Sequence, residues 1–399
     1  LAAIKTWTGG GADPHKWDAD DNWTPNKPED TDRAIISTDA TITTLDADAS
    51  VAILGFVEGG KLTVNIAANT LTVKKIQVAN APEATLHVED NPGNFVWGDA
   101  GSSPVKILEG SKLILQAAAP HKVTGVAGPL TLSGGGGLVL EAPVDGVTDL
   151  KIDGGSTLVV SADTGDNKGA LPALTGTLNT VTITNGNLVI DAENFGNSAM
   201  KLTLKEGNLT LNKPLGANFK TVVISGDLKV AGDGKIGDDT VPDGQVNLKA
   251  YSRLLLQKDL KLKTLTTADG SQIDTGDKTL TVKAADSFAI NATVTGNLNL
   301  EVPAAQTVIL NKDVDGKVGF KAPSGGTATL ELADQAFARK VDFTAATPGD
   351  TFKLKLGQNS EIGTLSFVRT TNGLEVESAG DNAYIDFLAP DAAAVATLK

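Results

Sequence analysis

Short segments in which apolar and polar residues alternate recur along the whole chain. Each segment starts at a turn residue and continues as an aliphatic residue, one variable residue and a second aliphatic residue, as in KLTV at 61–64, NLVI at 187–190 and GLEV at 373–376. An alternation of period two places the aliphatic side chains on one face of a β-strand and Thr, Lys and Asn on the other. No helical period persists beyond a single turn. The pattern predicts an all-β chain.

The spacing of these segments indicates a repeat. TVTI, KLTL, TVVI and QVNL begin at positions 180, 201, 221 and 245, and a second strand segment follows each of them after six to eight residues. A unit of about 20 to 24 residues lies within the range of solenoid repeats. We therefore predict a parallel β-solenoid, or β-helix, of about 16 coils, in which each coil packs only on its neighbours.

A string of antiparallel β-sandwiches is the competing fold, because such modules also show short strands at intervals of about ten residues. It requires distinct linkers between modules. The turn-rich segments GGGG at 134–137 and PDG at 242–244 could serve as linkers, but the strand motif continues across both without a change of character. This continuity favours the solenoid.

Residues 1–36 differ in composition from the rest. They contain Trp7, Trp17 and Trp23, three of the four Trp residues in the protein. The first coil of a solenoid leaves an open sheet edge, which invites uncontrolled pairing, and a bulky aromatic segment can cover it. We expect a cap and entry segment at 1–44, a solenoid at 45–390 with any break near 231–245, and a C-terminal tail at 391–399.

The entry segment also carries a recognisable motif. It reads W-x-G-G, then Trp, then Asn-Trp, then Pro and Asp before an aliphatic strand, on Trp7, Gly9, Gly10, Trp17, Asn22, Trp23, Pro28, Asp32, Ala34, Ile35 and Ile36. This segment resembles the entry segment of bacterial exported β-helix surface proteins, which are autotransporter-passenger-like or surface-layer-like. The resemblance covers about a tenth of the chain. It implies export, a parallel β-helix and a role at the cell surface.

Composition narrows the range of partners and compartments. The formal net charge of −14 disfavours binding to nucleic acid, because an acidic surface repels phosphates. The chain has no Cys and a single Met, Met200, which excludes disulfides and thiolate chemistry and fits an exported protein exposed to oxidants. No apolar run approaches the length of a membrane-spanning helix.

The sequence offers no recognisable catalytic set. Its three histidines, His15, His87 and His121, show no zinc-site spacing, and neither HExxH nor GxSxG occurs. Polysaccharide lyases and hydrolases built on β-helices are the enzymatic alternative, but the clustered Asp residues here are accompanied by few Arg or aromatic residues. We therefore expect a protein that is not an enzyme.

A calcium site is the one cofactor that the sequence suggests. The Gly-punctuated segment 231–244 carries Asp233, Asp238, Asp239 and Asp243, whose oxygens suit a hard cation. The segment DADDN at 18–22 is a second candidate. Asp, Asn and Gly are also ordinary turn formers, and turn formation is the interpretation that we favour.

Three hypotheses for the function follow, each of a different class. The first is a structural subunit of an extracellular cell-surface assembly, a surface layer or filament that associates with itself through solenoid ends or sides. The second is an adhesin or autotransporter passenger that binds a host surface or a cell-surface glycan. Its candidate presented loop lies at 88–106 and contains Phe95 and Trp97, whose rings could instead pack against the solenoid. A polysaccharide-active enzyme is the third hypothesis.

Overall fold

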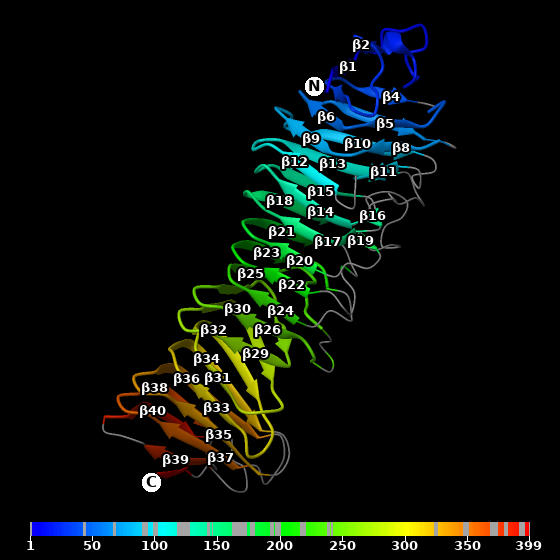
Figure 1. Cartoon of the computed structure of the whole chain (residues 1–399). Helices are drawn as coiled ribbons and strands as arrows, with labels where there is room; N and C mark the ends of the chain where they lie inside the picture. Colours follow the sequence, from blue (N-terminus) through cyan, green and yellow to red (C-terminus); the bar gives the residue numbers. More distant parts are fainter. Residues whose placement is uncertain are drawn as a thin grey trace. The chain divides into compact units, whose positions relative to one another are not determined.

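The computed structural model describes most of the chain and shows two compact units, Leu1–Asn218 and Phe219–Lys399. The described residues are 2–42, 45–66, 69–89, 95–98, 103–117, 128–141, 144–145, 147–161, 174–175, 180–191, 195, 201–215, 221–237, 240, 242–322, 326–345, 351–367, 374–378, 382–390 and 396–398. In each unit the strands of successive coils lie one above another (Figure 1).

The first unit contains two long sheets. Sheet A consists of β2 (Trp23–Thr24), β1 (Ile4–Trp7), β3 (Arg33–Ile36), β6 (Ile53–Val57), β9 (Ile76–Ala79), β12 (Ser103–Ile107), β14 (Gly128–Ser133), β17 (Val147–Ile152), β20 (Thr180–Ile183) and β22 (Lys201–Leu204). Sheet B consists of β4 (Ala40–Ile42), β7 (Lys61–Asn65), β10 (Ala84–Glu89), β13 (Lys112–Ala117), β15 (Gly137–Leu140), β18 (Ser156–Ser161), β21 (Gly186–Asp191) and β23 (Gly207–Leu211). Neighbouring strands are parallel except β1 and β2.

Two smaller parallel sheets complete the coils of the first unit. One is formed by β5 (Ala49–Val51), β8 (Leu71–Val73) and β11 (Phe95–Trp97), and the other by β16 (Val144–Asp145) and β19 (Leu174–Thr175). A single-turn helix, η1 (Asp20–Asn22), precedes β2. Among the described residues there is no helix of the length and hydrophobicity needed to cross a membrane.

The second unit contains three parallel sheets. Sheet D consists of β24 (Thr221–Ile224), β26 (Gln245–Leu248) and β29 (Thr264–Thr267). Sheet E consists of β25 (Asp227–Val230), β27 (Arg253–Leu256), β28 (Leu260–Leu262), β30 (Gln272–Lys283), β32 (Thr293–Glu301), β34 (Val314–Ala322), β36 (Phe337–Ala345), β38 (Glu361–Phe367) and β40 (Tyr384–Pro390). Sheet F consists of β31 (Phe288–Ile290), β33 (Thr307–Leu310), β35 (Thr327–Leu332), β37 (Thr351–Leu356), β39 (Leu374–Ser378) and β41 (Ala396–Leu398).

The core is a set of aliphatic rows that run from coil to coil. In sheet B one such row is Leu62, Leu86, Leu115, Leu140, Val160, Ile190 and Leu211, each paired in register with the next. These side chains are fully buried. In this row, alternation along each strand therefore places the aliphatic residues of the motif in the interior, as the sequence predicts. In the second unit Phe320, Phe343 and Phe352 add a buried aromatic cluster with ring centroids 5.1 to 6.1 Å apart.

Tight turns join strands at the coil corners. Several of these turns consist of four residues, of which the third has a positive φ. The fourth is a buried Ser whose hydroxyl donates a hydrogen bond to the backbone carbonyl of the first residue. Ser252 Oγ bonds Lys249 O at 2.6 Å, and Ser271 Oγ bonds Ala268 O at 2.6 Å. Each hydroxyl thus has a partner inside the turn, so the chain reverses without leaving that buried polar group unsatisfied.

The parallel β-solenoid predicted from the sequence is confirmed. About 12 turns are supported in the part of the chain that the structure describes, so the expected count of about 16 coils is not confirmed. The first unit ends at residue 218, and the segment 231–245 lies inside the second unit. Residues 396–398 of the predicted tail pair with β39 as a strand.

Candidate functional site

Three Trp side chains from the N-terminal segment form one buried cluster. Trp23 packs edge-to-face on Trp7 and on Trp17, with ring centroids 5.0 and 4.8 Å apart. Its indole N–H donates to the Trp17 carbonyl at 2.9 Å. The three rings are 4% exposed or less. The geometry satisfies the edge-to-face preference of aromatic rings, and it joins β1, β2 and the loop between them.

A buried amide organises that loop. Asn22 is fully buried, and its side chain donates to the carbonyls of Asp13 and Lys16 at 2.7 and 2.8 Å. Its Oδ1 accepts the backbone N–H of Gly11 at 2.9 Å. A Cβ at Gly11 would lie 2.7 Å from that oxygen, so the close approach requires Gly.

The same loop contacts the backbone at the beginning of the first coil. His15 Nδ1 lies 3.0 Å from the carbonyl of Thr41, which belongs to β4. Asp18 accepts the backbone N–H of Ala47 at 3.2 Å, and Lys16 pairs with Asp46 at 3.0 Å. The hydrogen bond and charge of Asp46 raise the pKa of Lys16 above its ordinary value. Within the described residues, β4 pairs with β7 alone.

The carboxylates of the entry segment are used in turns. Asp20 accepts the backbone N–H of Lys27 at 3.2 Å, and Asp21 accepts that of Ala12 at 3.2 Å. Together with the Asp18 contact, these bonds support turn formation for the DADDN segment. Among the described residues no group of three or more His, Asp or Glu is placed to hold a metal ion.

The acidic segment at 231–244 is described in part. Asp233 lies in a turn and Asp243 in the loop before β26, and Asp238 and Asp239 lie outside the described residues. A Cβ at Gly237 would collide with Asp243 Oδ1, which shows that this carboxylate lies against the turn backbone. Calcium binding by these four residues stays a prediction.

The aromatic residues of the predicted presented loop are inside the solenoid. Phe95 and Trp97 are 0% and 1% exposed, and β11 places them over Leu71 and Val73 of β8. Both rings fill the interior behind the sheet of β5, β8 and β11, so neither is available to a partner. The alternative in which they pack against the solenoid therefore holds. His121 lies outside the described residues, and His87 is half-buried near Glu89, with Nε2 and Oε1 3.9 Å apart.

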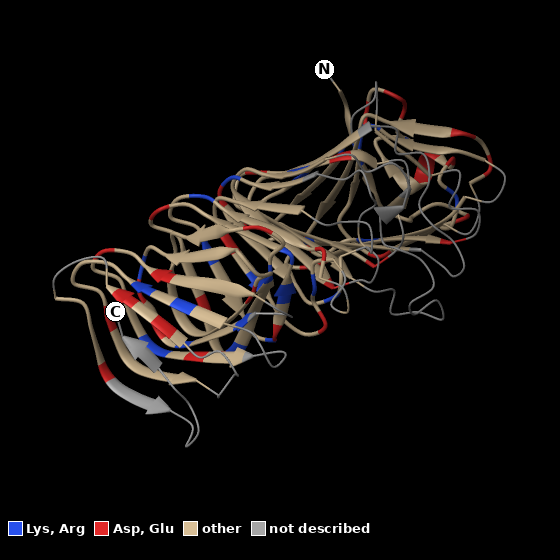
Figure 2. Cartoon of the chain, turned by 90° about the horizontal axis from the view of Figure 1, so that it is seen from below, with Lys and Arg blue, Asp and Glu red and all other residues tan. Residues whose placement is uncertain are grey.

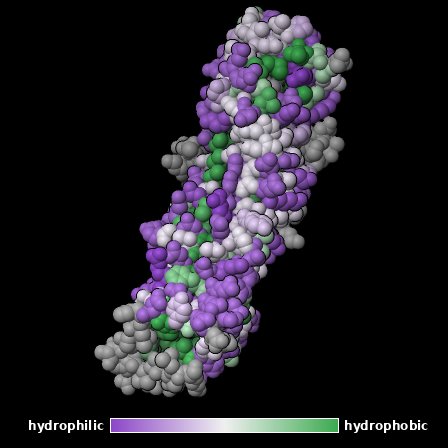
Figure 3. Space-filling view, turned by 90° about the vertical axis from the view of Figure 1, so that its left-hand side faces the viewer, coloured by the Kyte–Doolittle hydropathy of each residue, from purple (hydrophilic) through white to green (hydrophobic). Residues whose placement is uncertain are grey.

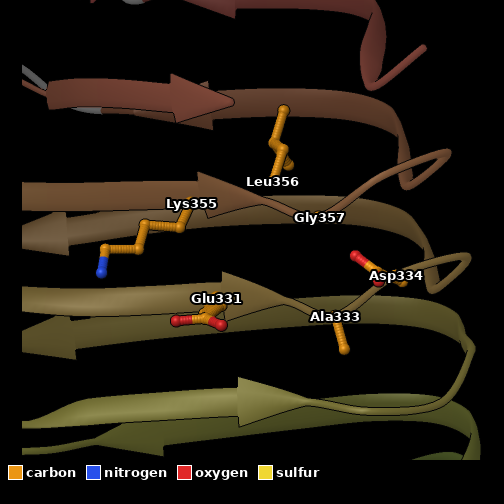
Figure 4. A pocket seen from close by; sticks show the side chains of 6 residues that line it. All are labelled: Glu331, Ala333, Asp334, Lys355, Leu356 and Gly357. Carbon is orange, nitrogen blue, oxygen red and sulfur yellow. The ribbon is translucent and has the colours of Figure 1, made fainter. Parts of the chain in front are cut away.

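An open groove of about 470 Å³ lies on the outer side of sheet F. It is lined by Glu331, Ala333, Asp334, Lys355, Leu356 and Gly357. Glu331 and Lys355 are paired in register on β35 and β37, and both side chains point away from the strands, while Asp334 lies in the adjoining turn (Figure 4). Asp334 accepts the backbone N–H of Gln358 at 2.8 Å, so its carboxylate also holds the next turn in place.

Ion pairs connect the outer residues of successive coils in the second unit, where Figure 2 shows acidic and basic residues on neighbouring strands. Lys353 on β37 pairs with Glu377 on β39 at 2.6 Å. Asp342 on β36 pairs with Lys317 on β34 at 2.6 Å and accepts a hydrogen bond from Ser366 on β38. Burial opposes ionisation of Asp342, but the bonds from Lys317 and Ser366 outweigh it and hold its pKa below the ordinary value.

The pKa of a second carboxyl group on sheet E is shifted in the opposite direction. The pKa of Glu361 is raised by partial desolvation and by the negative charge of Asp386, and a hydrogen bond from Tyr384 opposes the rise. Sequence reasoning missed these pairs because it had no measure of register between coils. The outward alternation of Lys, Asp and Glu in each strand was its only signal.

Comparison with known proteins adds no relative. No family model matches the chain, and neither a curated protein nor a solved structure matches it.

Proposed function

We propose that this chain is a structural subunit of an extracellular cell-surface assembly, a surface layer or filament, and that it associates with copies of itself rather than catalysing a reaction. The observation that carries the proposal is the regularity of the outward side chains. In register from coil to coil, polar residues of similar chemistry follow one another, such as Thr157, Asn187 and Asn208 on sheet B. Such periodic faces suit repeated contacts between identical subunits.

The row of amides is itself ordered by hydrogen bonds. Asn208 Nδ2 donates to Asn187 Oδ1 at 2.7 Å, and Asn187 Nδ2 donates to Thr157 Oγ1 at 3.1 Å. On sheet F, the ion pair between Lys353 and Glu377 fixes outward side chains in the same manner. An outer face whose side chains are already ordered loses less conformational entropy when it packs on another copy.

In this proposal the N-terminal segment acts as a cap. Its contacts with Thr41 and Ala47 occupy backbone groups at the start of the first coil, and its Trp cluster fixes β1 and β2 beside β3. A covered edge does not recruit strands from other chains. Assembly would then proceed through the sides of the solenoid.

Electron microscopy of the purified chain tests the proposal. We expect ordered sheets or filaments at high protein concentration, in buffer with EDTA or with added Ca²⁺. A difference between the two buffers would reveal a role for the cation. Particles that stay monomeric in both buffers, by light scattering and in micrographs, would contradict a structural role.

A binding module is the second candidate, and the groove on sheet F favours it. Glu331, Asp334 and Lys355 present both signs of charge beside the buried Leu356, which suits a polar ligand such as a cell-surface glycan. A glycan array probed with the wild-type chain and with Lys355→Ala tests this role. Retention of one glycan class by the wild type and its loss by the variant would support an adhesin.

A further inference from the structure

Sheet B carries an apolar row on its outer face. It consists of Ile114, Val139, Val159 and Val189, on β13, β15, β18 and β21, and each is paired in register with the next. Thr85 precedes this row and Thr210 follows it. The four side chains are half-buried, and they alternate along their strands with residues of the core, so they lie on the outer face. Strands β18, β21 and β23 of sheet B lie on the left of Figure 1. Figure 3, in which that side faces the viewer, shows a narrow band of hydrophobic residues bordered by hydrophilic ones.

The two flanks of the apolar row differ in hydrogen-bonding chemistry. One flank, which we call the amide row, consists of Lys112, Gly137, Thr157, Asn187 and Asn208, paired in register from β13 to β23. Its ammonium, hydroxyl and amide groups supply hydrogen-bond donors. The other flank contains Gln116, Glu141, Ser161 and Asp191, of which Gln116 and Glu141 bond at 2.7 Å. We call this second flank the acidic row. Its carboxylates are acceptors and carry charge.

This face of sheet B is complementary to the same face of a second copy. If a second copy faces the first across a two-fold axis parallel to the stacking direction, the apolar rows meet at the centre. The same rotation exchanges the flanks, so the acidic row of each copy lies opposite the amide row of the other. Asp191 then faces Asn187, and Glu141 faces Gly137, which lies between Lys112 and Thr157, so neither carboxylate faces another carboxylate. A two-fold contact of this kind is isologous and closes after two copies.

The size of the surface suits a weak contact. Strands of about six residues span about 20 Å, and five stacked strands span about 20 Å, so each copy would bury roughly 400 Å². The total of about 800 Å² lies below the roughly 1,200 Å² at which standard specific interfaces begin, in the range of weak contacts. Such a contact becomes firm only when further contacts hold the same copies together, as in a lattice.

We infer that the apolar row of sheet B with its two flanks is a lateral docking surface for a second copy of this chain. The inference rests on the proposed structural role and specifies the surface that serves it. The partner's matching element is the same sheet B face, with the coil stacks of the two copies parallel.

Sedimentation velocity of the full-length chain and three variants tests the surface. Val159→Lys places a charge in the centre of the contact, and Thr182→Lys places the same charge on the outer face of β20 in sheet A as the matched control. Asn208→Lys puts a cation opposite the acidic row of the partner. Over about 1 to 300 µM protein we expect a monomer–dimer equilibrium, weakened about tenfold or more by Val159→Lys, unchanged by Thr182→Lys and tightened by Asn208→Lys.

The outcomes separate the surface from the function. Equal association of Val159→Lys and Thr182→Lys, with both folded by circular dichroism, overturns the docking surface, and so does a wild type that stays monomeric. Ordered assemblies in micrographs of those same samples would then sustain the structural role through another surface. Dimers that Val159→Lys disrupts, without any larger assembly of the wild type, would sustain the surface and count against the structural role.

Discussion

At the scale of single residues, the cluster of Trp7, Trp17 and Trp23 joins distant parts of the N-terminal segment. Trp23 contacts both other rings and also donates a hydrogen bond to the backbone of Trp17. Large side chains of this kind stabilise a structure by burial and by edge-to-face contact together. The cluster therefore ties the local geometry of the segment to the stability of the first coil.

We expect Trp23→Ala to reduce the free energy of unfolding of the first unit by about 3–5 kcal/mol. The variant loses the buried ring and its hydrogen bond and leaves a cavity between Trp7 and Trp17. Urea unfolding followed by far-ultraviolet circular dichroism measures the change. Trp23→Phe, which keeps a ring but not the indole N–H, should lose less; equal stability of the Ala variant and the wild type would contradict the packing role.

Backbone conformation at the coil corners gives a second residue-scale prediction. Tyr251 has φ of 61° and is 87% exposed, whereas Asn359 holds the same turn position with φ of 55°. Asn tolerates the left-handed region better than Tyr does. We expect Tyr251→Asn to stabilise the second unit by about 0.5–1 kcal/mol and Asn359→Tyr to destabilise it by a similar amount. Thermal unfolding of both variants checks the signs, and a shift of both in one direction would refute the explanation.

The hydrophobic alternation was sufficient to predict which side of most strands faces the core, but not which turns take positive φ. Gly110 and Gly270 are recognisable candidates at this turn position, while Tyr251 and Gln335 adopt the same conformation without any sequence signal. The buried Ser that follows Tyr251 stabilises its turn through a hydrogen bond. Tertiary context therefore determines a backbone state that the residue type alone would not choose.

At the scale of strands, register between coils decides the outer chemistry. The segment motif predicted inward Leu and Val correctly for rows such as that of Leu140 and Val160. It could not predict which outward residues become neighbours, because that depends on the length of each intervening turn. The same limit left Phe95 and Trp97 open as a candidate presented loop beside the interpretation in which they pack against the solenoid, since a three-residue strand carries too short an alternation to be recognised.

The ion-pair ladder of sheet E leads to a pH-dependent prediction. The folded-state pKa of Asp342 is lowered, so its contribution to stability is present above the unfolded-state pKa and is lost as pH falls through the folded-state pKa. We expect Asp342→Asn to cost about 0.5–1 kcal/mol at pH 7, because solvent screens this partly exposed group, and to cost almost nothing at acidic pH. Unfolding measured from pH 7 to pH 3 checks the trend.

Glu361 provides the opposite case. Its folded-state pKa is raised, so its ionisation disfavours the folded state once pH rises through that value. We expect Glu361→Gln to raise the melting temperature slightly at pH 7 and to leave it unchanged at acidic pH. A lower melting temperature at pH 7 would show that the contact with Tyr384 outweighs the repulsion from Asp386.

At the scale of the whole molecule, net charge opposes self-association. A formal charge of −14 makes identical copies repel one another. Salt shortens the range of this repulsion to about 10 Å at 0.1 M, while it leaves apolar contacts in place. Any lateral contact between copies should therefore respond to ionic strength.

We expect association to strengthen severalfold between about 0.01 and 0.3 M NaCl because screening removes the repulsion. Light scattering at constant protein concentration measures it. CaCl₂ at matched ionic strength is the control for a specific cation site. A larger effect of CaCl₂ than of NaCl would indicate bound Ca²⁺, and dissociation at high salt would show that ion pairs, not apolar rows, hold the copies together.

The position of the indoles has a practical consequence for spectroscopy. All four Trp residues, Trp7, Trp17, Trp23 and Trp97, belong to the first unit, and the two Tyr residues, Tyr251 and Tyr384, belong to the second. Trp emission excited at the red edge of absorption therefore reports on the first unit alone, where three of the four indoles lie in the N-terminal segment. This emission does not report directly on the melting of the second unit. A difference between the fluorescence and circular dichroism transitions would therefore resolve the unfolding of each half without any label.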